Sequence, residues 1–178
     1  MYRLLLVDDE KIERNGILFL MRQLHLQLQV TEAANGKEAL EYLSKNPVDI
    51  LLTDVKMPFM DGITLLEHVS KQYPDMKKII FSGYSEFEYA RKAIKLGVDE
   101  FLLKPVNIKE ISEVMTKIKT EIAKVNEEES KVAKLKESAE KNYDILRESF
   151  LLRLVENRIG EEEATKKLET YNCSDLVD

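Results

Sequence analysis

The sequence predicts an α/β protein built on a parallel β-sheet with helices on both faces. The main observation is that short apolar runs rich in Val, Ile and Leu alternate strictly with amphipathic stretches through residues 1–106. Runs of this length, bounded by turn residues, are typical of strands buried on both faces. Strands that alternate with helices favour a parallel sheet, because each parallel connection needs a crossover.

The expected elements follow one another in a regular order. The runs that predict strands are residues 2–7, 28–33, 49–54, 77–82 and 99–104. The stretches with helical spacing are residues 14–25, 36–46, 62–73 and 85–97, several of them closed by Gly, Asn or Pro. A fifth helix is expected to begin near Asn107, just after Pro105.

The pattern changes from Ile111 onward. One apolar position recurs every seven residues, at Ile111, Ile118, Val125, Val132, Ala139 and Leu146. This spacing predicts a long helix that packs on the sheet at its start and pairs with another helix later. The partner position is interrupted by Glu129 and Lys136, so a solvated helical linker remains an alternative. Residues 142–172 are compatible with a helical hairpin.

Composition limits the class of protein. With 44% hydrophobic and 34% charged residues and a net charge of −6, the chain reads as soluble and globular. No apolar run approaches the ~20 residues of a membrane span, so we expect a cytoplasmic protein without membrane contact. Both residues 1–106 and 107–178 are net negative, which argues against direct nucleic-acid binding.

Polar side chains stand where four of the expected strands end. Asp8 and Asp9 follow the first strand, Asp54 ends the third, Ser82 ends the fourth and Lys104 ends the fifth. Each has an ordinary explanation by itself, as a helix cap, a turn residue or a surface charge. Because the carboxyl ends of parallel strands meet at one edge of the sheet, we expect these side chains to share one pocket.

This set of side chains suits phosphoryl transfer. Carboxylates packed together repel, so a cation is expected, and with oxygen ligands and no nearby His or Cys the best candidate is Mg²⁺. An aspartate can accept a phosphoryl group as an acyl phosphate while a metal and a lysine offset the charge. Asp54 is the candidate acceptor, because it stands alone in the middle strand; Lys104 and Ser82 would contact the phosphoryl oxygens.

The motifs resemble those of the receiver domains of two-component response regulators. The matching stretches, in order across residues 1–120, are LLLVDDE, ILLTDVKMPFMDG, IIFSGYSEFEYARKAIKLGV and EFLLKPV. The resemblance implies a flavodoxin-like (CheY-like) doubly wound sheet of five parallel strands in the order 2-1-3-4-5. It implies a receiver domain over residues 1–122, followed by a helical linker or coiled-coil-like extension over residues 123–178.

The resemblance also implies a metal site and a phosphoacceptor. Asp54 would be the phosphoacceptor. Asp9 and Asp54 would bind Mg²⁺ directly, together with the backbone carbonyl of Lys56, and Asp8 would help through water.

Two further positions correspond to the conformational switch of the family. Ser82 matches the switch hydroxyl and Phe101 the switch aromatic, where many members carry Thr and Tyr. The Lys104–Pro105 bond resembles the family's cis peptide, which directs the lysine into the pocket.

The resemblance implies partners as well. A sensor histidine kinase would donate the phosphoryl group. A homodimer would form through the face of the fourth helix, fifth strand and fifth helix, through the helical extension, or through both. The larger pattern, including ESFLLRLVENRI and EEEATKKLE, is similar to YesN-type regulators, in which an AraC-type DNA-binding module follows. That module does not appear here, so we expect the N-terminal part of a transcriptional regulator, or a fragment of one.

Two enzyme classes and a scaffold are the alternatives. Aspartate-dependent phosphatases need a second acid two residues after the nucleophile, where this chain has Lys56. FMN proteins need a hydroxyl- and Gly-rich phosphate loop after the first strand, where this chain has acids. A scaffold that is never phosphorylated would not need the full set of polar residues. We therefore expect a phosphoacceptor switch, with at most self-phosphorylation from small donors and slow autodephosphorylation.

Overall fold

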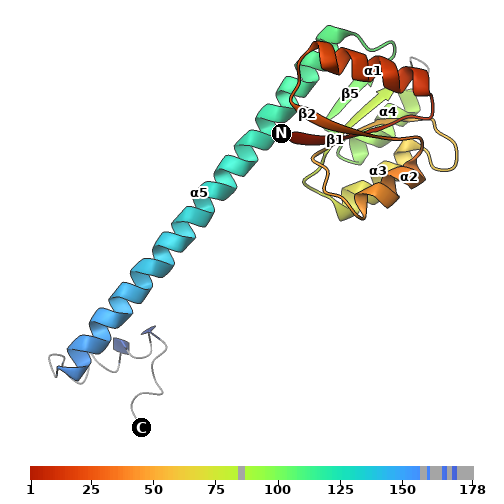
Figure 1. Ribbon diagram of the computed structural model, residues 1–178. Coiled ribbons are helices and arrows are strands. Elements are labelled where there is room, and N and C mark those ends of the chain that lie inside the picture. The colour runs from red at the N-terminus through yellow and green to blue at the C-terminus, as the bar shows by residue number, and fades with distance from the viewer. Residues whose placement is uncertain (84–86, 157–159, 161–165, 168–169, 172–178) are drawn as a thin grey trace. The chain divides into compact units, whose positions relative to one another are not determined.

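The computed structural model describes residues 1–83, 87–156, 160, 166–167 and 170–171. The chain divides into two compact units, Met1–Ile122 and Ala123–Asp178. The first unit holds a five-stranded parallel sheet in the order β2-β1-β3-β4-β5, as predicted (Figure 1). Its strands are β1 (Tyr2–Val7), β2 (Leu28–Ala33), β3 (Ile50–Asp54), β4 (Lys77–Ser82) and β5 (Glu100–Leu103). The helices are α1 (Lys11–Gln23), α2 (Gly36–Leu43), α3 (Gly62–Gln72), α4 (Phe87–Lys95) and α5 (Ile108–Val155).

The prediction that every strand is buried on both faces holds only for the centre of the sheet. All five residues of β3 are buried, and so are the last four of β1 and the last five of β4. The edge strands differ, because β2 exposes Gln29 and Glu32 and β5 exposes Leu103. An edge strand has only one neighbouring strand, and helices cover its faces less completely than those of a central strand.

The helix starts explain part of the difference between expected and observed boundaries. Asp61 caps α3 by accepting a hydrogen bond from the Thr64 N–H at 2.7 Å. In contrast, α1 begins at Lys11, three residues before the amphipathic pattern, and its N-cap residue Glu10 makes no side-chain cap bond. Asp8 and Asp9 therefore lie before the cap position, so the helix-cap explanation of these two acids is wrong.

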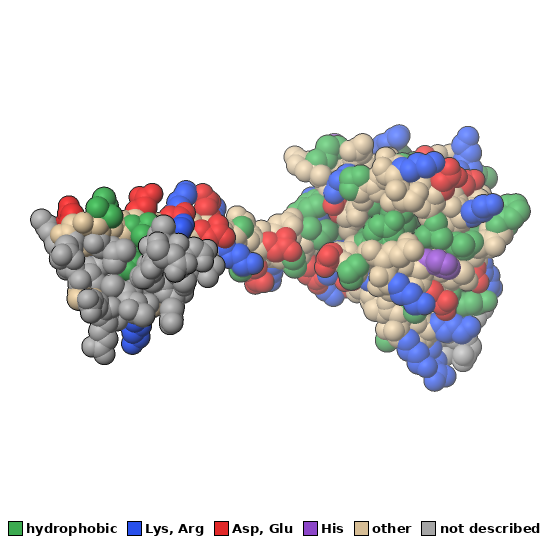
Figure 2. Space-filling model, turned by 90° about the horizontal axis from the view of Figure 1, so that it is seen from below, with side chains coloured by type: hydrophobic (Ala, Val, Ile, Leu, Met, Phe, Trp, Pro, Cys, Tyr) green, Lys and Arg blue, Asp and Glu red, His purple; other side chains and the backbone are tan. Residues whose placement is uncertain are grey.

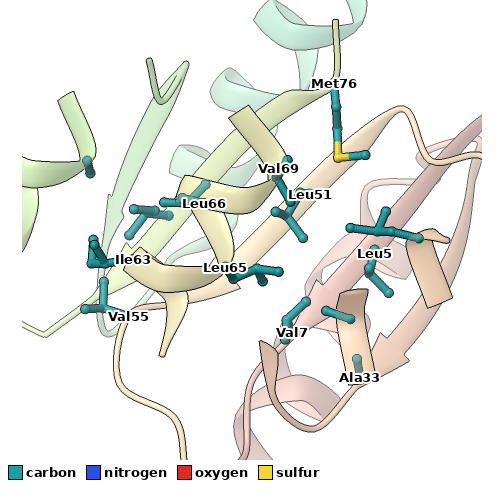
Figure 3. Close-up of a cluster of buried hydrophobic side chains, with 14 residues drawn as sticks. Leu5, Val7, Ala33, Leu51, Val55, Ile63, Leu65, Leu66, Val69 and Met76 are labelled. Atoms are coloured by element: carbon teal, nitrogen blue, oxygen red, sulfur yellow. The ribbon is translucent and has the colours of Figure 1, made fainter. Parts of the chain in front are cut away.

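Two hydrophobic clusters fill the space on the two faces of the sheet. Alternate residues of β1 point to opposite sides, so that Leu5 and Val7 join the cluster under α2, α3 and α4 (Figure 3). Leu4 and Leu6 join the cluster under α1 and the start of α5. In that second cluster α5 contributes three buried side chains, Ile111, Met115 and Ile118, at helical spacing. This confirms that the fifth helix packs on the sheet where it begins.

In the residues that the structure describes, the second unit is mostly helix with few buried side chains. Every residue of α5 from position 123 to position 149 is exposed, and side chains of both charges follow one another along it (Figure 2). Phe150 is buried, and its ring lies 5.4 Å from that of Tyr171, which also contacts Tyr143. Of the helical hairpin expected over residues 142–172, the part after Gly160 lies mostly outside the described residues. Within the described part of the chain, no helix has both the length and the apolar character needed to cross a membrane.

Candidate functional site

Polar side chains from several strands meet at the carboxyl edge of the sheet, as the strand order requires. Asp8 and Ser82 are fully buried, Asp54 is nearly so and Asp9 is exposed. The carboxylates of Asp8, Asp9 and Asp54 each offer an oxygen, and these oxygens lie within 4.8 Å of one another. Asp8 and Asp9 are adjacent in the sequence and Asp54 is far from both, but the fold brings the three acids into one cluster.

Lys104 joins this cluster from the connection after β5. Its Nζ lies 3.2 Å from Asp8 Oδ2 and 3.1 Å from Asp54 Oδ2. The same ammonium pairs with Glu13 of α1 and stands 4.8 Å from the centre of the Phe81 ring. The Lys104–Pro105 peptide bond is cis, as the motif suggests. Lys104 is therefore positioned among the acids by several independent contacts.

Ionisation of the buried Asp54 and Asp8 carboxylates is energetically unfavourable in the metal-free protein, because burial raises the pKa of both. Burial raises the pKa of Asp54 to about 6, against the opposing charge and hydrogen bond of Lys104 and the bond from the Val55 N–H. Burial also raises the pKa of Asp8, although the Glu10 N–H at 2.6 Å and the Lys104 ammonium oppose that rise. Burial by itself would lower the pKa of Lys104, but Glu13, Asp54 and Asp8 raise it above its ordinary value.

The raised pKa of Asp54 predicts that this residue destabilises the metal-free fold at neutral pH. The folded-state pKa of about 6 lies above the ordinary value of 3.8, so the contribution of Asp54 to stability falls as pH rises between those values. The side chain is only 11% exposed, and the shift corresponds to about 3 kcal/mol at most. Asp54→Asn is therefore expected to be more stable than the wild type near neutral pH, by up to that amount.

Urea unfolding without metal at about pH 4 and about pH 7 measures this effect. Lys104 keeps Asp8 and Glu13 as partners in the variant, so its ammonium is not left unpaired. The gain in free energy of unfolding is expected at the higher pH and should nearly vanish at the lower one. A variant that is no more stable than the wild type at neutral pH would contradict the prediction.

The donor set fits a hard divalent cation. Asp8, Asp9 and Asp54 supply carboxylate oxygens only, which suits Mg²⁺ better than softer metals. Lys56, predicted to contribute its backbone carbonyl, is exposed two residues after Asp54, and its ammonium lies 6.0 Å from the centre of the Tyr89 ring. That orientation directs the Lys56 side chain toward α4.

The two predicted switch residues lie on the neighbouring strands β4 and β5. Ser82 ends β4, and its hydroxyl donates a long hydrogen bond of 3.5 Å to the carbonyl of Gly83. Phe101 is half-buried in β5, where its backbone pairs with that of Ile80. Its side chain packs on the hydrophobic cluster under α2, α3 and α4.

Sequence reasoning missed Glu13 as a member of the site. Glu10 occupies the N-cap position of α1, and Glu13 is the acid of its first turn. The apolar pattern carried no signal for this contact, because it predicted a helix start at residue 14, after Glu13.

A parallel sheet of this order, with clustered acids and a lysine at its carboxyl edge, defines a class of phosphoacceptor domain. The sequence model of the response regulator receiver domain family matches residues 4–116, and the chain belongs to that family. Receiver domains take phosphate from sensor kinases and generally bind Mg²⁺ at their acidic residues. The chain is thus a receiver of a two-component response regulator, a phosphoacceptor switch and not a classical enzyme.

The chain is similar to parts of longer proteins, among them a transcriptional regulator and a sensor kinase. The uncharacterized transcriptional regulatory protein YesN of Bacillus subtilis (strain 168) is 39% identical over 137 residues, which are 76% of this chain and 37% of YesN. Sensor kinase CckA of Brucella abortus (strain 2308) is 39% identical over 111 residues, or 61% of this chain and 11% of CckA. The chain therefore spans well under half the length of these relatives.

Solved structures show the same fold. The REC domain of AraT, a response regulator from Geobacillus stearothermophilus, matches with a TM-score of 0.63 and 38% identity, over 69% of this chain and 96% of that domain. A two component transcriptional regulator AraC from Clostridium phytofermentans ISDg matches with a TM-score of 0.58 and 37% identity, over 66% of this chain and 91% of that chain.

Proposed function

We propose that Asp54 accepts a phosphoryl group from a sensor histidine kinase and that this event switches the receiver between two conformations. The observation that carries the proposal is the position of the Lys104 ammonium. It bridges Asp54 and Asp8 at one side of a three-carboxylate cluster. A buried carboxylate with both a fixed cation and a set of hard oxygen donors beside it is equipped to become an acyl phosphate.

The contacts of Asp54 fix its carboxylate for the reaction. The Val55 N–H donates to Oδ1 at 2.7 Å, and Lys104 contacts Oδ2 at 3.1 Å. In the transfer, a carboxylate oxygen of Asp54 forms a bond to phosphorus while the bond from phosphorus to the donor breaks. Lys104 offsets the negative charge of the phosphoryl oxygens, and Ser82 supplies a hydroxyl that can donate to one of them.

The metal ligands proposed are the side chains of Asp9 and Asp54 and the backbone carbonyl of Lys56, with Asp8 acting through water. Support comes from the clustered carboxylate oxygens and from the burial that raises the pKa of both Asp8 and Asp54. When bound, Mg²⁺ would supply positive charge beside the transferring phosphoryl group. A bound cation would offset the cost of ionising these buried carboxylates, which supports the proposal that the cluster is a metal site.

The proposed response to phosphorylation runs through Ser82 and Phe101. Movement of the Ser82 hydroxyl toward the phosphoryl group would accompany inward rotation of Phe101 on the neighbouring strand. The face formed by α4, β5 and α5 would change as a result, and the population of molecules would shift toward the active form.

We further propose that residues 1–122 are the receiver domain and residues 123–178 a helical extension that joins it to an effector. The name of YesN, a transcriptional regulatory protein, favours an effector that controls transcription. We propose that an AraC-type module outside residues 1–178 binds the DNA, in keeping with the AraC regulator of similar fold, and that the protein acts in the cytoplasm. Exposed apolar side chains at the seven-residue repeat, including Val125, Val132 and Leu146, favour a homodimer through α5. The face of α4, β5 and α5 is the second proposed interface, alone or together with the first. A sedimentation mass of one chain, with and without a phosphoryl mimic, would contradict dimer formation.

Incubation with acetyl phosphate and Mg²⁺ tests the phosphoacceptor directly. Intact mass is expected to show one phosphoryl adduct on the wild type, little adduct when a chelator replaces Mg²⁺, and none on Asp54→Asn. Asp75→Asn is the matched control, because Asp75 is an exposed acid just before β4, at the opposite edge of the sheet. An adduct that persists on Asp54→Asn, or is absent from the wild type, would contradict the proposed function.

A further inference from the structure

The Lys104 ammonium is in contact with three carboxylates. A lysine ammonium carries three N–H donors. Three carboxylates surround it, those of Asp8 at 3.2 Å, Asp54 at 3.1 Å and Glu13. Two of these partners belong to the acidic cluster, whereas Glu13 comes from the first turn of α1 and lies outside that cluster. Glu13 is therefore an additional partner that the phosphoacceptor chemistry itself does not require.

Glu13 is held in position by the helix that carries it. The next residue, Arg14, donates to the backbone carbonyl of Asp8 at 2.6 Å and to the Glu32 carboxylate at 2.9 Å. One turn further, Ile17 is buried in the cluster under α1 and α5. The backbone at Glu13 is thus fixed relative to β1 and β2, so the pairing of Glu13 with Lys104 is built into the fold.

When Asp54 carries a phosphoryl group, the phosphoryl oxygens replace the Asp54 carboxylate as partners of the ammonium, and Asp8 and Glu13 compete with them for Lys104. Asp8 is fully buried, so water cannot take the place of the ammonium beside its carboxylate, and loss of that contact is costly. The Glu13 side chain is 35% exposed, so water can replace the ammonium at low cost. Glu13 is the partner that can yield.

The surroundings give the Glu13 side chain space to move away. Glu13 and Lys104 form the charged part of a groove of about 630 Å³ between α1 and the connection from β5 to α5. The rest of its lining is mostly apolar and includes Phe19, Leu20 and Val106. This groove is open to solvent beside the pair, so rotation of the Glu13 carboxylate displaces no buried side chain.

We propose that Glu13 is a positioning residue that holds the Lys104 ammonium in the unphosphorylated state and competes with the phosphoryl group for it. The inference rests on the proposed function of Asp54 as phosphoacceptor. Through this competition Glu13 weakens binding of a phosphoryl group or its mimic and slows phosphorylation. Release of Lys104 from Glu13 then accompanies occupation of the site.

Affinity for beryllofluoride in the presence of Mg²⁺, measured by calorimetry on the whole chain, tests the competition. Glu13→Gln is expected to bind this mimic about two- to fivefold more tightly than the wild type, the change that corresponds to loss of one partly exposed ion pair. The initial rate of adduct formation from acetyl phosphate should rise in the same direction. A tighter complex is an outcome that mere structural damage would not produce.

Glu10→Gln is the matched control, because it removes the same charge from an exposed position at the start of the same helix. The affinity of Glu10→Gln for beryllofluoride and its initial rate of adduct formation should equal those of the wild type. Unchanged or weaker binding by Glu13→Gln, while the wild type binds normally, would overturn the inference alone. An equal increase in affinity for beryllofluoride in Glu10→Gln would overturn the inference too, because the effect would then come from the loss of any negative charge near the site. A wild type that neither binds the mimic nor takes a phosphoryl group would overturn the proposed function itself.

Discussion

Replacing Lys104 with Gln is expected to slow phosphorylation of Asp54 by acetyl phosphate by at least about a hundredfold. The ammonium is the cation placed against both the acceptor carboxylate and Asp8, so its removal takes away the charge that offsets the phosphoryl oxygens. The loss should appear in the initial rate of adduct formation, followed by intact mass with saturating Mg²⁺.

Lys77→Gln is the control for loss of a paired lysine in general. The Lys77 side chain has the same 21% exposure as that of Lys104, and its ammonium is likewise paired with acids, Asp99 at 2.8 Å and Glu121 at 2.7 Å. It begins β4 and so lies at the opposite edge of the sheet. Lys77→Gln is expected to lower stability while keeping the wild-type rate. Equal loss of rate in both variants would contradict a specific role for Lys104.

Replacing Gly62 with Ala is expected to cost about 3 kcal/mol or more of the free energy of unfolding. A Cβ on Gly62 would lie 2.0 Å from the backbone oxygen of Asp54 and 3.1 Å from the Cα of Val55. The loop cannot easily yield, because the Gly62 N–H donates to the Val55 carbonyl at 2.8 Å. The clash is with backbone, so a change of side-chain rotamer cannot relieve it. Urea unfolding of the metal-free protein measures the cost.

Gly16→Ala, the same substitution at another glycine, is expected to raise the free energy of unfolding. Gly16 lies inside α1, and a Cβ there would meet nothing within 4 Å. Alanine is the better helix former, so this variant should be more stable by up to about 1 kcal/mol. A Gly62→Ala protein as stable as the wild type would mean that the loop behind Asp54 is not closely packed.

The strand order and the acidic cluster could be predicted because topology leaves little choice. Buried apolar runs that alternate with helices give a parallel sheet. Because Asp8, Asp54 and Lys104 each stand at or just after the end of a strand, they meet at the carboxyl edge of that sheet although they are far apart in the sequence. A one-residue change in strand boundary, such as β3 starting at Ile50 and not at residue 49, does not alter that edge.

Side-chain partners depended on details that the pattern did not contain. Glu13 reaches Lys104 because α1 begins at Lys11, and the apolar periodicity alone placed that start later. The burial of β2 was overestimated for a similar reason, because apolar content does not show which strand forms an edge. Helix starts and edge positions are set by tertiary contacts that a local pattern does not encode.

The measurement that tests the central proposal most directly is chemical location of the phosphoryl group. Borohydride reduces an aspartyl phosphate at the residue that carries it, and peptide mass spectrometry then identifies that residue. After reaction with acetyl phosphate and Mg²⁺, reduction is expected at Asp54 alone. Reduction at Asp8, at Asp9 or at any other acid, with Asp54 unmodified, would contradict the assignment of Asp54 as the phosphoacceptor.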